Sequence, residues 1–560
     1  MKKTPHTDNP LAIEFTPKLI SSLREGYSPS ALRKDVFAGL TVAIVALPLS
    51  MAIAIASHAG PESGLYTAII GGFIISAFGG SRFQVGGPAG AFIVLVASII
   101  DRQGFGGLLL ATMMAGVILM ALGFLRLGTY IKYVPHPVIV GFTAGIATII
   151  LASQLKELFG LELPGAEPAN LVPKLQALWQ ATPSFNPSAA LVAALSILII
   201  LGLRKYRPHW PGFLIAVVSA AVLAWALQLD IETIATRFGG IPRSLPAPAF
   251  PEISFEKMTL LLPDVLALAL LGGIESLLSA VVADSMSGRR HRSSMELVAQ
   301  GLANIVAPIF GGITATGTIA RTATNVRGGA HGPMAGIFHA AFILLFMAVA
   351  APLAGYIPLS ALAGILVVVA WNMVEKSAFR SLLANSRGDA TVLLATFLLV
   401  IFVDLPTGIT VGVVLGCLVF MHRMAQAIDI QTHHHADVNP DAEYVTAPGI
   451  IIHRISGAFF FGAASAVLTT LERINEVPKA YILDFTQVPF VDSSAAHGLR
   501  GFLQKVGQQG APVYVTGATP AVRRELTRSG IKEPDVRFGK TVEASIAAIK
   551  SGLDFDQDDE

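Results

Sequence analysis

The sequence predicts a polytopic α-helical membrane protein that ends in a small cytoplasmic α/β domain. Three observations predict this class: long apolar runs over the first three quarters of the chain, a charged share of only 14%, and a change near residue 446 to short strand-like runs alternating with helical patterns. A soluble multidomain protein is excluded, because soluble domains typically carry about 25% charged residues.

The apolar runs divide into about fourteen candidate spans, since a span needs roughly 20 apolar residues, or fewer where the helix is broken. They cover residues 36–56, 64–80, 87–100, 107–125, 134–153, 189–203, 212–228, 259–284, 296–310, 312–325, 333–353, 357–373, 390–403 and 405–422. An even number of spans places both termini on one side of the membrane. Loops on that side hold about twice as many Lys and Arg residues as the opposite loops, which predicts cytoplasmic termini.

Composition divides the chain into five parts. They are a cytoplasmic N-terminal segment without the apolar core of a signal peptide (1–35), a transport domain (36–424), a polar linker (425–445), an α/β domain (446–553) and an acidic tail (554–560). In the α/β domain we expect strands at 449–455, 480–488 and 512–516 and helices at 463–475, 494–508, 519–529 and 541–550.

Two short glycine-rich segments, residues 86–92 and 311–320, lie in matching halves of the membrane part. Paired, interrupted segments of this kind are the best sequence indication of a transport site in a membrane protein. Each is expected to begin a half-helix at mid-membrane depth, where the helix N-terminus carries unpaired N–H groups and partial positive charge. Two such ends facing each other would enclose an anion. The expected substrate site comprises Ser50, Gly87, Pro88, Ala89, Gly90, Thr316, Gly317, Thr318, Ala320 and Arg321.

Three side-chain types near these segments each have a second interpretation. Arg321 is expected to add positive potential at the site, or else to extend its charge to the cytoplasmic border. Thr316 and Thr318 offer hydroxyls to a substrate, although threonines also satisfy backbone groups in broken helices. Pro48, next to Ser50, is expected to unwind the first span near the cavity, with an ordinary kink as the alternative.

Glu275 is the only carboxylate that the sequence places well inside an apolar span, and such a residue is functional by default. Ser279 follows one helical turn later on the same face. Together they would take up a coupling proton or help to coordinate a cation such as sodium. The alternative is that Glu275 is paired permanently with Arg321 and holds two spans together.

Chemistry outside the membrane part is less strongly indicated. Asp492 suits the N-cap of a helix, which places Ser494 in the first turn as a possible regulatory phosphorylation site. The three histidines at 433–435 could bind a metal, but their spacing favours a solvated linker. We expect no enzymatic activity, cofactor, metal site or nucleic-acid partner, because no nucleotide-binding loop, zinc spacing or nucleophile elbow is present.

Several motifs together resemble the SulP family of anion transporters, which carry a C-terminal STAS domain. They are A-L-P-L-S-M-A in the first span, S-R-F-x-V-x-G-P before the third, G-G-I-E-S-L-L-S-A-V-V-A-D in the eighth, E-L-V-A-Q-G-L-A-N in the ninth, Arg321, and the D-S-S of the last domain. The resemblance implies two inverted seven-span repeats, half-helices in spans 3 and 10, a core domain against a gate domain, and a homodimer. It also implies an anion bound between the two half-helices, with membrane lipid around the spans.

Details of these motifs suggest a substrate. Sulfate-transporting relatives commonly carry Gln and an aromatic residue after Pro48, and this chain has neither. Sodium–bicarbonate relatives have Asp and Thr in place of Glu275 and Ser279 and lack Arg321. The P-L-x-M-A, I-A-R and N-V-R motifs are similar to those of enterobacterial four-carbon dicarboxylate transporters, which implies proton-coupled uptake across the inner membrane. The alternatives are a sulfate or bicarbonate carrier, possibly coupled to sodium, a uracil- or xanthine-type carrier, and a membrane-anchored signalling scaffold whose cytoplasmic domain binds a protein partner.

Overall fold

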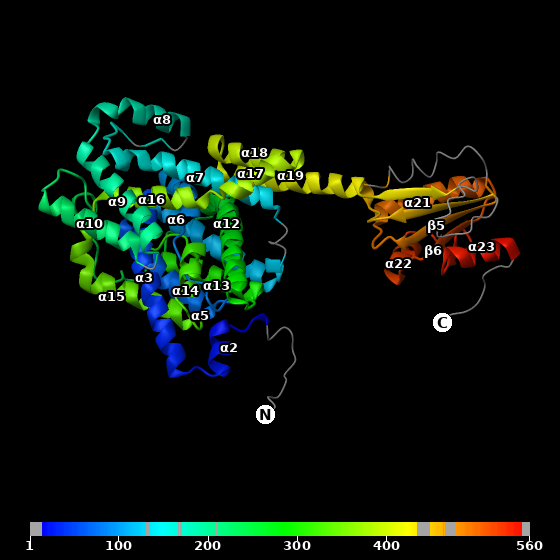
Figure 1. Cartoon of the computed structure of the whole chain (residues 1–560), viewed down its shortest axis with the longest axis horizontal. Coiled ribbons are helices and arrows are strands. Elements are labelled where there is room, and N and C mark those ends of the chain that lie inside the picture. Colours follow the sequence, from blue (N-terminus) through cyan, green and yellow to red (C-terminus); the bar gives the residue numbers. More distant parts are fainter. Residues whose placement is uncertain are drawn as a thin grey trace. The chain divides into compact units, whose positions relative to one another are not determined.

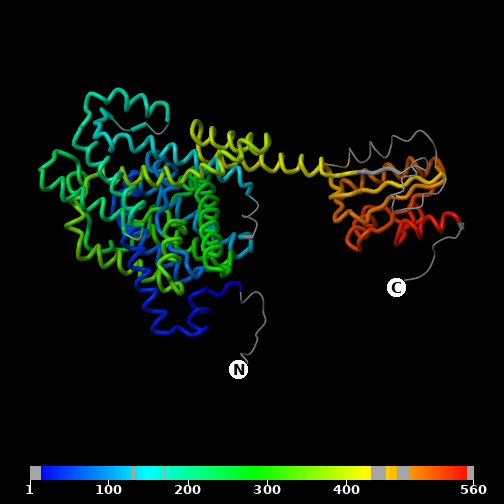
Figure 2. The backbone as a smooth tube through the Cα atoms, in the orientation of Figure 1, coloured from blue at the N-terminus to red at the C-terminus, as the bar shows by residue number. Residues whose placement is uncertain are grey.

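The computed structural model describes residues 14–129, 134–165, 167–168, 171–208, 210–433, 449–462, 464 and 478–551. The chain forms two compact units, Met1–Val414 and Leu415–Glu560. The first is almost entirely helical and the second contains the larger β-sheet (Figure 1). Figure 2 follows the backbone through the helices of the first unit in sequence colours.

The helices of the first unit differ widely in length. They are α2 (Lys18–Arg24), α3 (Pro29–Ala56), α4 (Pro61–Tyr66), α5 (Gly72–Phe78), α6 (Ile93–Phe124), α7 (His136–Phe159), α8 (Leu171–Gln180), α9 (Pro187–Tyr206), α10 (Gly212–Ala226), α11 (Ile234–Phe238), α12 (Phe255–Ser287), α13 (Ser293–Val306), α14 (Ile319–Arg327), α15 (Met334–Ala354), α16 (Leu359–Met373), α17 (Lys376–Asn385), α18 (Arg387–Phe402) and α19 (Leu405–Gln426). Among the described residues, eight helical stretches are long and apolar enough to cross a membrane by length and composition. The remaining expected spans fall on shorter or broken helices, so the total of fourteen stays a prediction.

The helices pack in two groups. In one group, α3, α5, α6, α12, α13, α14 and α15 contact one another, and in the other α7, α9, α10, α16 and α18 do so. Small residues allow close approach within the first group: a Cβ on Gly116 of α6 would lie 2.6 Å from the carbonyl oxygen of Gly301 of α13. Such close backbone approach is typical of helix packing in membranes.

The first span is one continuous helix, so the expected unwinding at Pro48 is wrong. α3 runs through Pro48 without a break. The hydroxyl of Ser50 donates to the carbonyl oxygen of Ala46 at 2.6 Å, which is the kind of side-chain bond that supports helix backbone near a proline in a membrane. The alternative, a proline tolerated within the helix, agrees with the structure.

The second unit contains a five-stranded sheet in the order β3 (Asp429–His433), β4 (Ile450–Ser456), β5 (Ala480–Gln487), β6 (Val513–Thr516) and β7 (Arg537–Gly539). β3 is antiparallel to β4, and the other neighbours are parallel. Alternation along β4 sends Ile451 and Ile455 into a core shared with α21 (Ser493–Gln508) and α22 (Pro520–Arg528). Ile450 and Ile452 face a second core with α23 (Val542–Ser551).

Two details of this unit differ from the sequence expectation. The stretch 425–445, expected to be a linker, contains strand β3, which pairs with β4 from Asp429 opposite Ser456 to His433 opposite Ile452. The short strand β7 was not expected either. The helix expected at 463–475 lies outside the described residues except for Ala464.

Candidate functional site

The two short glycine-rich segments meet, although they are far apart in the sequence. Strand β1 (Gly86–Gly87) pairs antiparallel with β2 (Thr316–Gly317), with Gly86 opposite Gly317. Beyond β1 the chain enters a 3-10 turn at Gly90–Phe92 and then α6, and beyond β2 it enters α14, whose N-cap is Thr318. The first N–H groups of a helix have no partner within it, so two sets of such donors start from one pair of joined strands. We call this region, residues 86–92 and 316–321, the anion cage.

Glycine is required where the cage strands approach other groups. Gly87 has φ +154, and a Cβ there would lie 1.7 Å from Nη1 of Arg321. A Cβ on Gly317 would lie 1.5 Å from Nε2 of Gln84. Any side chain at either position would displace a neighbouring polar group, so the glycines permit the close packing of the cage.

Arg321 is buried in the cage with only 1% of its surface exposed, which rules out a residue that extends its charge to the membrane border. Nη1 donates to the carbonyl oxygen of Gly86 at 3.1 Å. Nη2 donates to Oγ of Ser50 at 3.0 Å and to the carbonyl oxygen of Pro88 at 3.3 Å. All three acceptors are neutral, and Nε has no partner in the part of the chain that the structure describes. Arg321 is therefore a buried cation that holds the first half of the cage.

The hydroxyls of Thr316 and Thr318 bond to backbone carbonyl oxygens. Oγ1 of Thr316 donates to Gly272 and Oγ1 of Thr318 donates to Val85, each at 3.3 Å. Gly90 is half-buried and Ala320 is exposed, while Pro88 and Ala89 are buried. The accessible part of the cage thus lies at the helix starts rather than at the threonine side chains.

Glu275 lies on α12 and is half-buried. No ion pair joins it to Arg321 within the described ranges, so the alternative of a permanent Glu275–Arg321 pair does not agree with the structure. Ser279 is fully buried, and its hydroxyl donates to Oγ1 of Thr322 on α14 at 2.9 Å. Ser279 therefore joins α12 to α14.

A layer of buried polar residues behind the cage was missed by the sequence reasoning. Asn304 accepts from the N–H of Ala315 and donates to its carbonyl oxygen, both at 2.8 Å, and Gln300 donates to the same oxygen. Glu296, Gln300 and Asn304 recur at every fourth position of α13, so they form a stripe on one helix face. That spacing is the signal that could have revealed them.

Glu296 is a second buried carboxylate, placed at the start of a helix and not well inside an apolar span as Glu275 is. Glu296 is completely buried, and its Oε2 accepts from the N–H of Ser81 at 2.9 Å. It lies in the first turn of α13 and fixes the loop that leads into β1. Its position at the edge of the apolar run concealed this burial.

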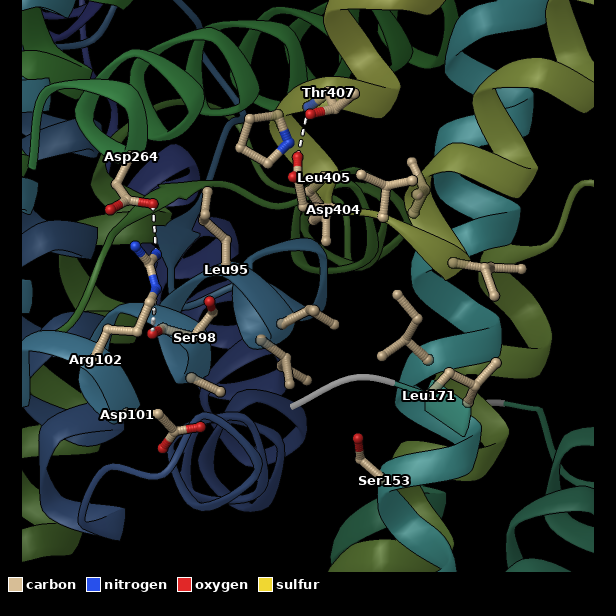
Figure 3. Close-up of a pocket in the computed structure, with 18 of the residues that line it drawn as sticks. Leu95, Ser98, Asp101, Arg102, Ser153, Leu171, Asp264, Asp404, Leu405 and Thr407 are labelled. Carbon is tan, nitrogen blue, oxygen red and sulfur yellow. Dashed lines mark hydrogen bonds and ion pairs between the residues drawn. The ribbon is translucent and has the colours of Figure 1, made fainter. Parts of the chain in front are cut away.

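A cavity of about 410 Å³ lies beside the C-terminal end of α3, where Ala56 and His58 line it (Figure 3). The sequence did not predict this cavity. Ile93 and Val94, from the first turn of α6 beyond the cage, contribute to its wall. In Figure 3 the guanidinium of Arg102 points toward Asp264, and Nη2 of Arg102 lies 2.8 Å from Oδ1 of Asp264. This pair ties α6 to α12 at the cavity edge.

In the second unit, Asp492 caps α21 by accepting from the N–H of Ala495 at 2.7 Å. Its other carboxylate oxygen accepts from the N–H of Phe461 at 3.0 Å. Ser494 is exposed in the first turn of the same helix. The structure thus leaves the Ser494 hydroxyl accessible.

The chain matches the sulfate permease family over residues 32–396 and the STAS domain over residues 441–545. The first match covers more than half of the chain and includes the whole anion cage. The protein therefore belongs to the sulfate permease family, with a C-terminal STAS domain.

Two relatives agree with this membership, and one solved structure shows the same fold. The chain is 40% identical to the putative sulfate transporter YvdB of Bacillus subtilis, over 90% of this chain and 95% of the relative. It is 30% identical to the bicarbonate transporter BicA of Picosynechococcus sp., over 89% of this chain and 90% of the relative. It shares its fold with the inward-facing murine anion transporter Slc26a9, with a TM-score of 0.85 and 19% identity over 98% of this chain and 96% of that one. The two relatives are named as transporters rather than enzymes.

Proposed function

We propose that the protein is a secondary active transporter of small anions, and that the anion binds in the cage between the starts of α6 and α14. The observation that carries this proposal is Arg321, a buried guanidinium whose acceptors are all neutral. An unpaired buried charge costs several kcal/mol, so the site is incomplete without a negative partner. A bound anion supplies that charge.

The remaining donors of the cage suit the same ligand. Helix N-termini bind phosphate, sulfate and carboxylate groups through their free N–H groups and their dipole. In the cage these groups belong to small residues, among them Gly90 and Ala320, which leave space beside the backbone. An oxyanion would thus be held by backbone donors, with Arg321 behind them as a source of positive potential.

The substrate class has two candidates. The names of the relatives YvdB and BicA favour an inorganic oxyanion, sulfate or bicarbonate. The first-span P-L-x-M-A motif, together with Glu275 and Arg321, favours a four-carbon dicarboxylate such as succinate. Both classes carry negatively charged oxygen atoms that accept hydrogen bonds from N–H groups. The donors of the proposed cage therefore suit either class.

Glu275 is the proposed coupling residue. Glu275 is half-buried on α12 and makes no ion pair with Arg321 in the described residues. An intramembrane carboxylate without a fixed cationic partner is suited to take up a proton or a sodium ion along with the anion. The lead proposal is symport with a proton, and sodium symport is the alternative.

The location, oligomeric state and domain roles are proposed together with transport. We place the protein in the inner membrane as a homodimer with cytoplasmic termini, and we assign the STAS domain a regulatory role, with Ser494 as a possible phosphorylation site. A signalling scaffold without transport activity is the weaker candidate, because an anchor needs neither paired broken helices nor a buried arginine.

The test is uptake of labelled sulfate, bicarbonate, succinate and aspartate into proteoliposomes that contain the full-length protein. A pH gradient and a sodium gradient are imposed separately. Accumulation of one anion, competed by its unlabelled form, supports the proposal, and the gradient that drives it identifies the coupling ion. Absence of uptake of every anion under both gradients contradicts it, provided that the reconstituted protein is monodisperse.

A further inference from the structure

A second anion site is indicated at the N-terminal end of the first unit, where α2 packs against the turn Gly79–Ser81. The N–H of Lys18 donates to the carbonyl oxygen of Gly79, and the N–H of Arg292 donates to that of Gly80, both at 2.9 Å. Arg82 follows this turn directly. Figure 1 shows α2 at the end of the helical unit, next to α5. The turn Gly79–Ser81 is thus bonded to the backbone of Lys18 and of Arg292 and is followed by Arg82, so three basic residues lie around it.

These three cations have few negative partners. Nη1 of Arg292 donates to Oγ of Ser21 at 2.9 Å and to the carbonyl oxygen of Thr16, both neutral acceptors. Arg82 pairs with Glu25, whose side chain is 54% exposed. The ammonium group of Lys18 makes no hydrogen bond or ion pair with any residue that the structure describes. Among the described residues, the carboxylate of Glu25 is the one that makes an ion pair with this group of three cations.

The electrostatics of the cluster agree with this deficit. Burial, followed by the charges of Arg292 and Arg82, lowers the pKa of Lys18 to about 8, against a smaller opposing effect of Asp284 and Glu25. Asp284 is bonded to His291, with 2.7 Å between Oδ2 and Nδ1. Burial and the neighbouring Arg82 also lower the pKa of Arg292. An anion bound among Lys18, Arg82 and Arg292 would offset the repulsion between their positive charges.

The outer face of α2 indicates where such an anion comes from. Ile20 and Leu23 are 41% and 50% exposed, while Ser22 on the opposite face is buried. A short helix with an apolar outer face and nearby basic residues is typical of a segment that lies at the membrane interface. Because α2 immediately precedes the candidate span α3, we expect α2 to lie near the level of the lipid headgroups.

We propose that Lys18, Arg82 and Arg292 bind the phosphate group of an anionic membrane lipid. The lipid phosphate would pair with the ammonium of Lys18, which has no partner among the described residues, and with the half-buried guanidinium of Arg292. The buried Arg82 would add positive charge from behind, and the acyl chains would pack beside Ile20 and Leu23. Bound lipid would then fasten α2 to the turn Gly79–Ser81, which leads into β1 of the anion cage.

The experiment measures lipid binding and not transport, so its outcome is independent of the proposed function. Full-length protein in detergent is titrated with phosphatidylglycerol, and bound lipid is counted by native mass spectrometry. The test variant is Lys18→Gln, and the matched control is Lys34→Gln, an exposed lysine one segment later. Lys18 was chosen because its ammonium makes no hydrogen bond or ion pair within the described part of the chain, so its replacement breaks none of the contacts seen there. Equal melting temperatures establish that both variants fold.

We expect Lys18→Gln to weaken phosphatidylglycerol binding about fivefold, the effect of one basic residue at a charged membrane surface, and Lys34→Gln to have less than a twofold effect. Lys18→Arg should retain binding. Equal losses in Lys18→Gln and Lys34→Gln, or no loss in either, would overturn the site. Displacement of phosphatidylglycerol by millimolar inorganic phosphate would overturn the lipid assignment and indicate a site for free phosphate. Phosphatidylcholine, which has no net charge, should bind at least fivefold more weakly.

Discussion

Nη2 of Arg321 lies 3.0 Å from Oγ of Ser50, so a single guanidinium joins the first turn of α14 to the C-terminal half of α3. The same side chain holds the carbonyl oxygens of Gly86 and Pro88. Arg321 therefore has two tasks that can be separated by experiment: it positions three segments, and it supplies positive potential to the anion cage.

Replacing Arg321 with Ala should lower anion affinity at least tenfold, and more for a divalent than for a monovalent substrate, because the lost Coulomb energy scales with ligand charge. Arg321→Lys should recover little, since a single ammonium cannot reproduce the planar set of donors. Binding isotherms on purified protein measure both effects. Arg327→Ala, an exposed arginine at the end of the same helix, is the control. Equal losses for both ligand charges would mean that Arg321 acts only by positioning.

The variant Gly87→Ala should abolish or strongly weaken substrate binding. An added methyl group would overlap Nη1 of Arg321, and the backbone at φ +154 is unfavourable for alanine. Gly202→Ala is the matched control, because the space around Gly202 on α9 is open. Ligand-dependent thermal stabilisation reports binding in both variants. Normal stabilisation of Gly87→Ala by substrate would show that the close packing of Arg321 on β1 is dispensable.

Enlarging Ala320 to Leu should block substrate binding while leaving expression and dimerisation intact, and Ala89→Leu should act in the same way from the other half of the cage. Backbone N–H donors reach a ligand only where no large side chain intervenes. Ala348→Leu, on an exposed face of α15, serves as the control. If the two cage variants bind substrate as the control does, the anion site lies elsewhere.

The variant Glu275→Gln should lose accumulation driven by a pH gradient but keep counterflow exchange of the anion, because the amide cannot take up a proton. Glu256→Gln, an exposed position near the start of the same helix, should behave like the unmodified protein. Proteoliposome uptake under imposed gradients measures both activities. Unchanged pH-driven accumulation in Glu275→Gln would exclude this residue as the coupling site.

Truncation after Gln426, which removes the sheet and helices of the STAS domain, should leave substrate affinity within about twofold while changing the transport rate or the stability of the dimer. The cage lies wholly within residues matched by the sulfate permease family. Size-exclusion chromatography first establishes that the truncated protein is folded. Complete loss of binding in a monodisperse truncated protein would show that the STAS domain contributes to the site.

The cage could be predicted from the sequence because its signal is local. Glycines and small residues at 86–92 and 311–320 interrupt the apolar runs, and this interruption is visible without knowledge of any distant contact. The partners of the cage side chains are not local, so they could not be predicted. The hydroxyl of Ser279 bonds to Thr322, and the acceptors of Arg321 come from α3, from β1 and from Pro88 just after it.

The remaining errors have equally specific causes. Glu296 begins an apolar run, and only the packed loop at Ser81 reveals its complete burial. Strand β3 is polar and carries histidine, so its sequence resembles a linker until pairing with β4 provides its hydrogen bonds. At Pro48 the expected break is absent, because the surrounding helices support α3 despite the missing N–H.

The pairing of β1 with β2 also sets an order of events during biosynthesis. Arg321 and the carbonyl oxygen of Gly86 that it holds are separated by 235 positions. At the usual pace of translation, the ribosome needs on the order of 10 to 50 s to cover that distance. During this interval the peptide groups of Gly86 and Gly87 are already within or beside the bilayer without their permanent partners. The nascent chain must therefore keep them hydrated or shielded by the insertion machinery, and the cage is complete only after α14 has been delivered.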